Sequence, residues 1–509
     1  MSESKQRKLG AILSYTSIAV NSLIQLLYTP LLIRMLGQSE YGLYSLVASI
    51  IGYLTVLDLG FGNAIVVYTS KYRAQNKLDE EKKLHGMFKI VFIIIGIIAG
   101  IIGMLLYLNI NNVFDKTMTT IELEKMRIMM IILTIHLVLT FSFGIYNSII
   151  SAYEKFVFQK LLAILNSILK PILMIPLLFL GYKSITMCLI ITIINIVVLF
   201  SNYIYCKKKL NISTKFLGFD IVLFKTIIGY SIWIFLGVIV DRVNWSVDNF
   251  VLGAVSGTLA VSIYSIAATL NNLFKNLSIA ISGVFLPKIS KLVANNASTE
   301  KLTKEMIKVG RIQNYIIFLM CSGLILFGKQ FIMIWAGKGF EESYYVALLL
   351  IIPVCIPLIQ NIGLSIIQAL NKFKFKSITS FIMSIINVII SIFFAKKWGA
   401  TGAALGTCIS LLVCNIIIMN FYYFKEIKLN IPKFWKSIIK QTIPFSIPII
   451  IILIIMYYSS FEGLKGLIIY GSIYTIIYVI VAYFLSMNSY EKNLIESILI
   501  KLHIKREKR

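Results

Sequence analysis

The chain has 509 residues, of which 58% are hydrophobic and only 14% charged, and its mean hydropathy is +0.86. Soluble domains are about 45–50% apolar and about 25% charged. The composition therefore excludes an ordinary soluble protein, a collagen-like chain and a disordered chain, and it indicates a polytopic membrane protein. The formal net charge of +27 then reflects Lys- and Arg-rich cytoplasmic loops, and no nucleic-acid partner is expected.

Apolar runs long enough to cross a bilayer follow one another along the whole chain. A hydrocarbon core of about 30 Å requires about 20 residues of helix. Fourteen such runs are predicted, with ends uncertain by about 3 residues, at residues 10–35, 41–66, 87–108, 128–150, 159–182, 184–205, 226–252, 257–283, 311–334, 344–370, 377–395, 399–424, 438–458 and 463–486. The first run is too long for a signal-peptide core, so we expect it to be retained as helix 1.

The distribution of basic residues predicts the orientation of these helices. Counted with the helix ends, 36 Lys and Arg residues lie in the two tails and the even-to-odd loops, and 10 lie in the opposite loops. Basic residues accumulate on the cytoplasmic side, so both termini are predicted to be cytoplasmic. The alternation also favours an even number of helices.

An internal repeat divides the chain into lobes. The segment IYNSIISAYEKFVFQK at residues 145–160 matches IGLSIIQALNKFKFKS at residues 362–377 in eight of sixteen positions, and KLNI at residues 209–212 recurs at 428–431. The two matches are separated by 217 and 219 residues. This agreement favours duplication of a six-helix unit, whose copies insert in the same orientation. The prediction is an all-α protein with an N-lobe at 1–212, a C-lobe at 213–431, and helices 13–14 with a basic tail at 432–509.

Charges within helices mark candidate sites, because they are costly in hydrocarbon and face a bundle interior or a cavity. The cationic candidates are Lys170, Arg242 and Lys275, together with Arg34 at the end of helix 1. Polar residues of helix 1, Asn21 and Gln25 among them, share one face, and so do those of helix 7. Interhelical hydrogen bonding would also produce such faces. Their presence in both lobes favours a shared cavity, in which cationic groups suit a phosphate or pyrophosphate.

Acidic residues within helices are the candidates for coupling to an ion. They are Asp241 and Asp248 in helix 7 and Asp58 in helix 2. Such carboxylates could bind a proton or sodium ion, or they could neutralise the neighbouring cations as fixed ion pairs. Asp241, near the bilayer centre and next to Arg242, is the first choice, with Asp58 next in line.

Motifs for nucleotide or metal chemistry are missing from the sequence. There is no GxxxxGK[ST] loop, no HExxH motif and no CxxC pair among the six cysteines. No cofactor, catalytic residue or metal site is therefore expected. The partners expected for such a chain include the lipids of the surrounding membrane.

Three segments resemble bacterial polysaccharide flippases of the multidrug/oligosaccharidyl-lipid/polysaccharide exporter superfamily. They are LLIRMLGQSEYGLYSL at residues 31–46, LDLGFGNAIVVYTSKYRA at 57–74 and SIISAYEKF at 148–156. The resemblance implies a transporter of the bacterial cytoplasmic membrane that flips an undecaprenyl-pyrophosphate-linked oligosaccharide for O-antigen, capsule or exopolysaccharide synthesis. It implies alternating access coupled to an ion gradient, and a complex with a polysaccharide polymerase is a further expectation.

Three alternatives remain open at this point. Lipid II flippases carry an Arg-Asp pair early in helix 1 and an Arg in helix 2, whereas this chain has neither. A multidrug or cation antiporter of the same fold usually has twelve helices. A membrane-embedded polymerase or ligase, from a different class, generally has a sizeable external loop, and the longest one here, at about residues 109–127, offers little room.

Overall fold

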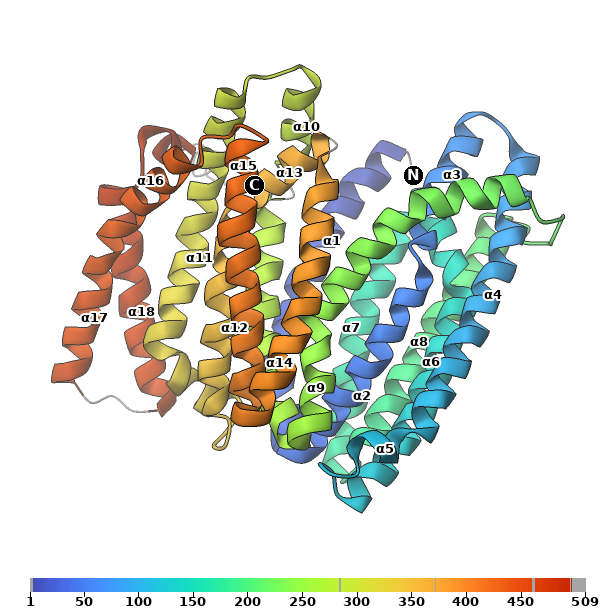
Figure 1. Cartoon of the computed structure of the whole chain (residues 1–509), viewed down its shortest axis with the longest axis horizontal. Helices are drawn as coiled ribbons and strands as arrows, with labels where there is room; N and C mark the ends of the chain where they lie inside the picture. The colour runs from blue at the N-terminus through green and yellow to red at the C-terminus, as the bar shows by residue number, and fades with distance from the viewer. Residues whose placement is uncertain (1–2, 283–284, 371, 460–462, 495, 497–509) are drawn as a thin grey trace, which may run out of the picture. The chain divides into compact units, whose positions relative to one another are not determined.

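The computed structural model describes residues 3–282, 285–370, 372–459, 463–494 and 496, and every regular element within them is a helix (Figure 1). Helices satisfy their own backbone hydrogen bonds, which an apolar, Ile-rich chain needs in lipid. The first nine helices are α1 (Glu3–Leu36), α2 (Gln38–Leu54), α3 (Phe61–Ala74), α4 (Leu78–Leu108), α5 (Ile110–Phe114), α6 (Thr120–Ala152), α7 (Phe156–Phe179), α8 (Ser184–Ile204) and α9 (Ile221–Ser282).

The second half of the chain is also helical. Its helices are α10 (Leu286–Ala294), α11 (Thr299–Trp335), α12 (Glu342–Ile359), α13 (Asn361–Ala369), α14 (Phe373–Leu411), α15 (Met419–Lys425), α16 (Ile431–Thr442), α17 (Ser446–Tyr458) and α18 (Gly463–Val481). Short 3₁₀ or π turns extend several of them: η1 (Thr55–Asp58), η2 (Tyr205–Lys209), η3 (Leu412–Ile418), η4 (Ile443–Phe445) and η5 (Ala482–Ser486). Twelve stretches of the described residues are long and apolar enough to span a membrane, which confirms the prediction of an all-helical polytopic membrane protein.

Two of these twelve stretches fold back on themselves. In α9 the backbone leaves helical geometry at Gly257, whose φ of 81° suits a residue without a side chain. On either side of this bend, Tyr264 donates a hydrogen bond to Asp248, and Ser265 donates one to Asn249 over 3.4 Å. Partners 16 residues apart along the chain can meet only if the two halves of α9 run antiparallel.

The same reversal occurs in α14 at Trp398 and Gly399, which also have non-helical geometry. The Ser391 hydroxyl donates a hydrogen bond of 3.2 Å to the carbonyl of Ala403, across the bend. Helices α9 and α14 are thus each a pair of antiparallel helices. For α14, the sequence analysis predicted the two separate runs at 377–395 and 399–424.

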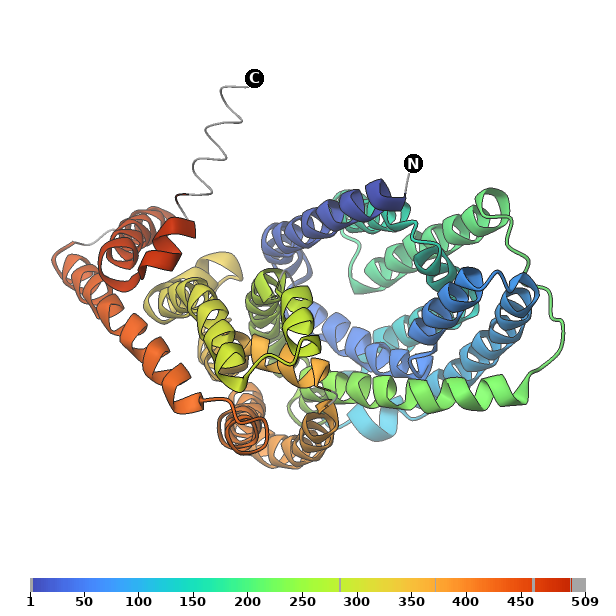
Figure 2. The same ribbon diagram turned by 90° about the horizontal axis from the view of Figure 1, so that it is seen from above.

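The chain forms two compact units. The first consists of Met1–Ile266 and Ser380–Gly406, and the second of Ala267–Thr379 and Thr407–Arg509. In the first unit α6 packs against both α4 and α8, and α1 packs against α7 (Figure 2). Glycines on α4 allow the close approach of α6: a Cβ at Gly96 would lie 3.0 Å from Ser142 Oγ, and one at Gly103 would lie 2.6 Å from Thr134.

In the second unit α18 packs against both α11 and α17. Three buried tyrosines, Tyr470, Tyr474 and Tyr478, follow one face of α18 at four-residue spacing. The Tyr474 hydroxyl lies 2.5 Å from the Ser322 hydroxyl of α11, and Tyr478 donates to the carbonyl of Tyr315 over 2.9 Å. The hydroxyls thus find partners inside an otherwise apolar contact.

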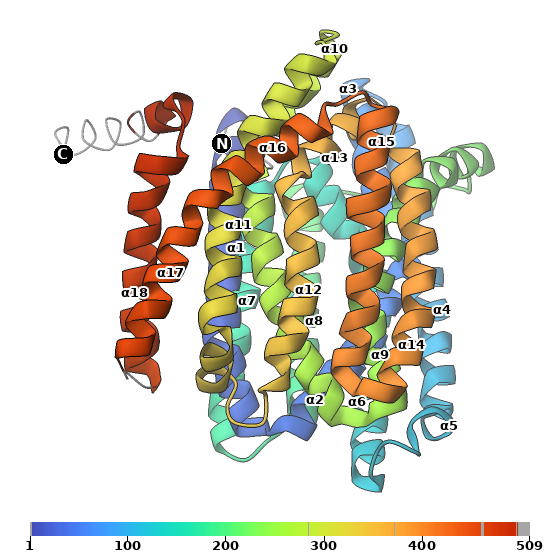
Figure 3. The same ribbon diagram turned by 60° about the vertical axis from the view of Figure 1, so that its left-hand side comes forward.

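Some helix boundaries differ from those predicted. Helix α11 begins at Thr299, twelve residues before the predicted run at 311–334, because its first turns are amphipathic and not apolar. The predicted run at 438–458 contains a 3₁₀ turn at η4, where Pro444 cannot continue an α-helix. Before this turn, α16 lies obliquely to α11, α15 and α17 (Figure 3).

Candidate functional site

A cavity of about 270 Å³ lies among α1, α2, α7 and α8 in the first unit. It brings together Asn21 and Gln25 of α1 with Lys170 of α7, three residues that the sequence predicted as substrate-binding. We call it the lysine pocket. Ser167, one turn before Lys170, donates a hydrogen bond of 2.6 Å to Asn21 Oδ1 and so joins the two polar helix faces.

Lys170 gives this pocket its charge. Of the described residues that line the cavity it alone is charged, and among the described residues its ammonium has no hydrogen-bond or ion-pair partner. The next residue, Pro171, has no backbone N–H and therefore removes the helical hydrogen bond to the carbonyl of Ser167. A cation without a described partner, within a membrane span, makes this cavity a candidate site for an anion.

A second, larger cavity of about 570 Å³ lies among α3, α4, α6, α7 and α8. Side-chain amides dominate its polar wall, and we call it the amide pocket. The amides come from six residues: Asn63, Asn147, Gln159, Asn166, Asn195 and Asn202. Asp58, predicted as an ion-coupling residue, is the one charged group among the described residues around this cavity.

The backbone between α2 and α3 breaks at the edge of the amide pocket. The sequence analysis predicted one continuous helix at 41–66. Instead, η1 ends at Asp58, and Leu59 and Gly60 have left-handed geometry, with φ of 52° and 74°. The Asp58 carboxylate accepts hydrogen bonds from the backbone N–H groups of Gly62 and Gly60, at the start of α3. Irregular backbone at membrane depth is tolerated where protein buries it or where it lines a cavity, as here.

The two pockets follow one another along α7 and α8. On α7 the amide pocket is lined by residues between 159 and 166, and the lysine pocket by residues between 167 and 174. On α8, which runs in the opposite direction, the lysine pocket uses residues between 187 and 191 and the amide pocket residues between 195 and 202. At 1.5 Å per residue, their centres are about 12 Å apart along the helices.

The other predicted charges lie outside these pockets. Asp248 is buried and accepts the hydrogen bond from Tyr264. Arg242 and Arg34 are exposed. Lys275 belongs to the second unit and is half-buried. The side chain of Asp241 lies outside the described residues.

Glu122, at the start of α6, is a polar residue whose role was not predicted. With Thr119 it forms a capping box: Thr119 N–H donates to Glu122 Oε2 over 2.8 Å, and Glu122 N–H donates to the Thr119 hydroxyl. Its other oxygen accepts hydrogen bonds from Ser39, which begins α2, and Thr258, which follows the bend of α9. One carboxylate therefore ties three helix ends together. A capping box is visible in the sequence TTIE, but the distant partners are not.

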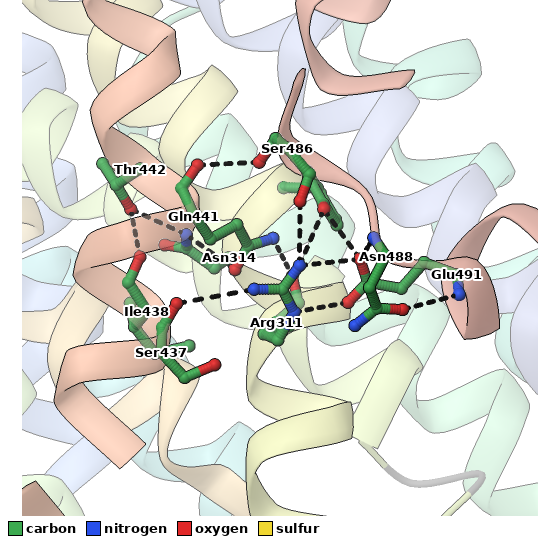
Figure 4. Close-up of polar contacts among 10 residues, drawn as sticks. Arg311, Asn314, Ser437, Ile438, Gln441, Thr442, Ser486, Asn488 and Glu491 are labelled. Atoms are coloured by element: carbon green, nitrogen blue, oxygen red, sulfur yellow. Dashed lines mark hydrogen bonds and ion pairs between the residues drawn. The ribbon is translucent and has the colours of Figure 1, made fainter. Parts of the chain in front are cut away.

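A buried ion pair in the second unit was also missed (Figure 4). Arg311 of α11 donates to both oxygens of Glu491, over 2.6 and 2.8 Å, and to the carbonyl of Ser486 over 2.9 Å. Tyr315 adds a hydrogen bond of 2.9 Å to Glu491, and Gln441 of α16 donates to the Arg311 carbonyl. This cluster joins α11 to α16 and to the chain that follows α18.

Comparisons with known proteins agree with this architecture. A Shigella flexneri protein named as an O-antigen transporter is 22% identical over 417 residues, 79% of this chain and 94% of its own. The capsular polysaccharide biosynthesis protein CapF of Staphylococcus aureus is 28% identical over 231 residues, 44% of this chain and 55% of its own.

Solved structures show the same fold. The lipid II flippase MurJ in an inward closed conformation has a TM-score of 0.71 at 20% identity, over 93% of this chain and 98% of its own. An inward-facing multidrug transporter of the MATE family has a TM-score of 0.64 at 14% identity, over 83% of this chain and 95% of its own. The sequence profile of the family described as "Polysaccharide biosynthesis protein" matches residues 9–293, more than half of the chain. The chain therefore belongs to the polysaccharide biosynthesis protein family.

Proposed function

We propose that this protein is a flippase that moves an undecaprenyl-pyrophosphate-linked oligosaccharide repeat unit across the bacterial cytoplasmic membrane, for synthesis of O-antigen, capsule or exopolysaccharide. Membership in the polysaccharide biosynthesis family and similarity to a protein named as an O-antigen transporter over 94% of its length support this function. The Shigella flexneri relative is named as a transporter, and a transporter rather than an enzyme is the function that the sequence predicted.

The observation that carries the proposal is the lysine pocket. A pyrophosphate is an anion that must pass the low-dielectric interior, where charge is costly unless the protein supplies an opposite one. Lys170 supplies a positive charge that no described carboxylate neutralises, and Asn21 and Gln25 supply hydrogen-bonding groups beside it. We assign these three residues to the substrate head group. Arg242, Lys275 and Arg34 serve other stages of the path.

The membrane topology proposed for this function has fourteen crossings. It is supported by twelve candidate spans, together with the bends at Gly257 in α9 and at Gly399 in α14, each of which separates two antiparallel helices. Six crossings form each lobe, two more form α17 and α18, and both termini are cytoplasmic. In this topology the lobes alternate between inward- and outward-open states.

Coupling to a proton or sodium ion is assigned to a carboxylate within the spans. Asp58 suits this role because it borders a cavity large enough to admit water and ions. Asp248 is less suitable, since it is buried and lines neither of the two pockets. Asp241 keeps its place as the candidate from the sequence.

An export assay tests the proposal. Cells that lack the native gene are complemented with the wild type, Lys170→Ala or Lys170→Arg, and lipid-linked oligosaccharide in the outer leaflet is labelled by periodate oxidation. We expect Lys170→Ala to lower export at least tenfold at equal protein level and Lys170→Arg to retain part of it. Lys116→Ala, at an exposed loop lysine, is the control. Full export by Lys170→Ala would refute the assignment of this pocket, and rescue of a lipid II flippase deletion would favour the peptidoglycan alternative.

A further inference from the structure

The amide pocket is distinct from the lysine pocket in its charge. Asp58 is the one ionisable group among the described residues that line it, so the wall has no cation to offer a pyrophosphate. The cavity volume of about 570 Å³ lies in the range of small-molecule sites, about 300–1,000 Å³. One water occupies about 30 Å³, so the pocket is far larger than a site for a single ion requires.

The wall offers paired hydrogen-bond donors and acceptors. Each Asn or Gln amide has a carbonyl that accepts and an NH₂ that donates two hydrogen bonds. A sugar hydroxyl both donates and accepts, so a ring of neighbouring hydroxyls matches a wall of amides and a carboxylate. The apolar part of the wall includes the rings of Phe92 and Phe141, against which the C–H face of a sugar can pack.

Part of this wall is already held in place by the protein. Gln159 donates to Asn147 Oδ1 over 2.9 Å and to the Ser151 hydroxyl over 2.8 Å, while Asn195 donates to Thr140 over 2.6 Å. Another part is unsatisfied: among the described atoms, the buried Oδ1 of Asn166 has no hydrogen-bond partner. A buried polar atom without a partner costs about 1–3 kcal/mol. A ligand hydroxyl that donates to Asn166 would remove that cost.

We propose that the amide pocket binds a neutral sugar unit of the oligosaccharide, while the lysine pocket about 12 Å away along α7 holds the anionic linkage. This inference rests on the proposed flippase function and adds the recognition of the glycan within one lobe. Asn166 stands at the boundary: it lines the amide pocket, and the next residue, Ser167, lines the lysine pocket. One molecule whose sugar is bonded directly to its pyrophosphate can therefore reach both.

The role of Asp58 follows from this arrangement. Its carboxylate is oriented by the backbone N–H groups of Gly60 and Gly62, and its remaining lone pairs can accept from two sugar hydroxyls. A sugar that binds there contacts the broken segment between α2 and α3. Sugar recognition and any ion taken up by Asp58 would then be linked through the same side chain.

Saturation-transfer NMR on the purified full-length protein in lipid nanodiscs tests the sugar site. The probe is the oligosaccharide released by mild acid from the native host's own lipid-linked precursor, with the methyl glycosides of glucose, galactose, N-acetylglucosamine and N-acetylgalactosamine beside it. We expect saturable binding of the released oligosaccharide, weakened at least tenfold by Asn166→Leu and by Asn195→Leu, which keep the branched shape of the side chain and remove its polar atoms. Asn112→Leu, at an exposed amide outside the pocket, should bind as the wild type does.

The outcomes separate this inference from the proposed function. Absence of saturable binding, or binding unchanged in both Leu variants, overturns the sugar site even if Lys170→Ala still abolishes export. Loss of binding in the Leu variants supports the sugar site even if the export assay points to another lipid-linked glycan. Unchanged sugar binding in Asn166→Leu, combined with loss of sodium-dependent export, would show an ion site instead and would also overturn the inference.

Discussion

Charges within the helices of the two units differ in how completely the protein satisfies them. Arg311 and Glu491 in the second unit are 8% and 5% exposed, and every polar group of the pair has partners. In the first unit, Lys170 borders a cavity and has no partner among the described residues. A position inside a helix bundle therefore does not by itself distinguish a functional charge from a structural one. We expect the number of hydrogen-bond and ion-pair partners left open to distinguish them instead.

Removal of one member of the satisfied pair should have the largest effect on stability. Arg311→Met leaves the Glu491 carboxylate buried without its cation, which costs about 3–5 kcal/mol. We expect a marked fall in the thermal midpoint of the purified protein and less protein in the membrane. The double variant Arg311→Met with Glu491→Met should recover most of the loss, because no buried charge remains. If the single variant were as stable as the wild type, the cluster would not hold α11 to the chain after α18.

Substitution of Lys170, the charge without a described partner, is expected to change stability in the opposite direction. Lys170→Met removes an unpaired cation from the membrane interior, where a central lysine costs about 2.5–3.5 kcal/mol. The variant should therefore unfold at a higher temperature than the wild type while its export falls. Lys116→Met, at the exposed loop, should change neither. A lower melting temperature for Lys170→Met would indicate a partner for the ammonium and would remove the contrast between the two units.

The sequence predicted the residues of the lysine pocket but not the ion pair of Arg311 and Glu491. Asn21, Gln25 and Lys170 were found because helical periodicity places polar residues on one face, and a charge within an apolar run is conspicuous. Arg311 lies at the edge of its run and resembles a loop cation. Glu491 is 180 residues away in a basic tail, so the pairing depends on tertiary packing that no local pattern encodes.

The amide pocket was missed for a related reason. Single Asn and Gln residues in apolar helices are usually interhelical hydrogen-bonding groups, so Asn166 and Asn195 gave no distinct signal. The break at Asp58 was also missed, because LDLGFG reads as apolar helix. Only the left-handed geometry of Leu59 and Gly60 ends the helix there. The class of fold, by contrast, depends on hydropathy summed over the whole chain, which local irregularities do not alter.

An intermediate effect is expected at Glu122, whose satisfied carboxylate must lose partners if the lobes move. Glu122→Gln keeps one carbonyl oxygen for either its cap or its bridge to Ser39 and Thr258, and hydrogen bonds to a charged group are worth about 1.5–3 kcal/mol. We expect the free energy of unfolding to fall by about 2 kcal/mol. We also expect a shift toward the conformation in which the ends of α2, α6 and α9 that Glu122 joins have separated. Cysteines at Ser39 and Thr258 report that shift, since their hydroxyls lie 3.4 Å apart. Oxidative cross-linking of the pair should arrest export, and reduction should restore it. Export that continues in the cross-linked protein would contradict alternating access at this end.

The smallest effect is expected at Asp248, the carboxylate that sequence alone could not separate from Asp58. Asp248 lies in the half of α9 before the bend, and the hydroxyl of Tyr264 donates to it from the other half. Asp248→Asn keeps an oxygen that can accept this hydrogen bond, so the loss should be about 1 kcal/mol, typical of one weakened hydrogen bond. Export by this variant should keep the wild-type dependence on pH and on the ion gradient. Asp58→Asn, whose carboxylate borders the amide pocket, should lose that dependence at comparable protein level. If the two results were exchanged, Asp248 would be the coupling carboxylate, and a position beside the amide pocket would not identify the residue that takes up the ion.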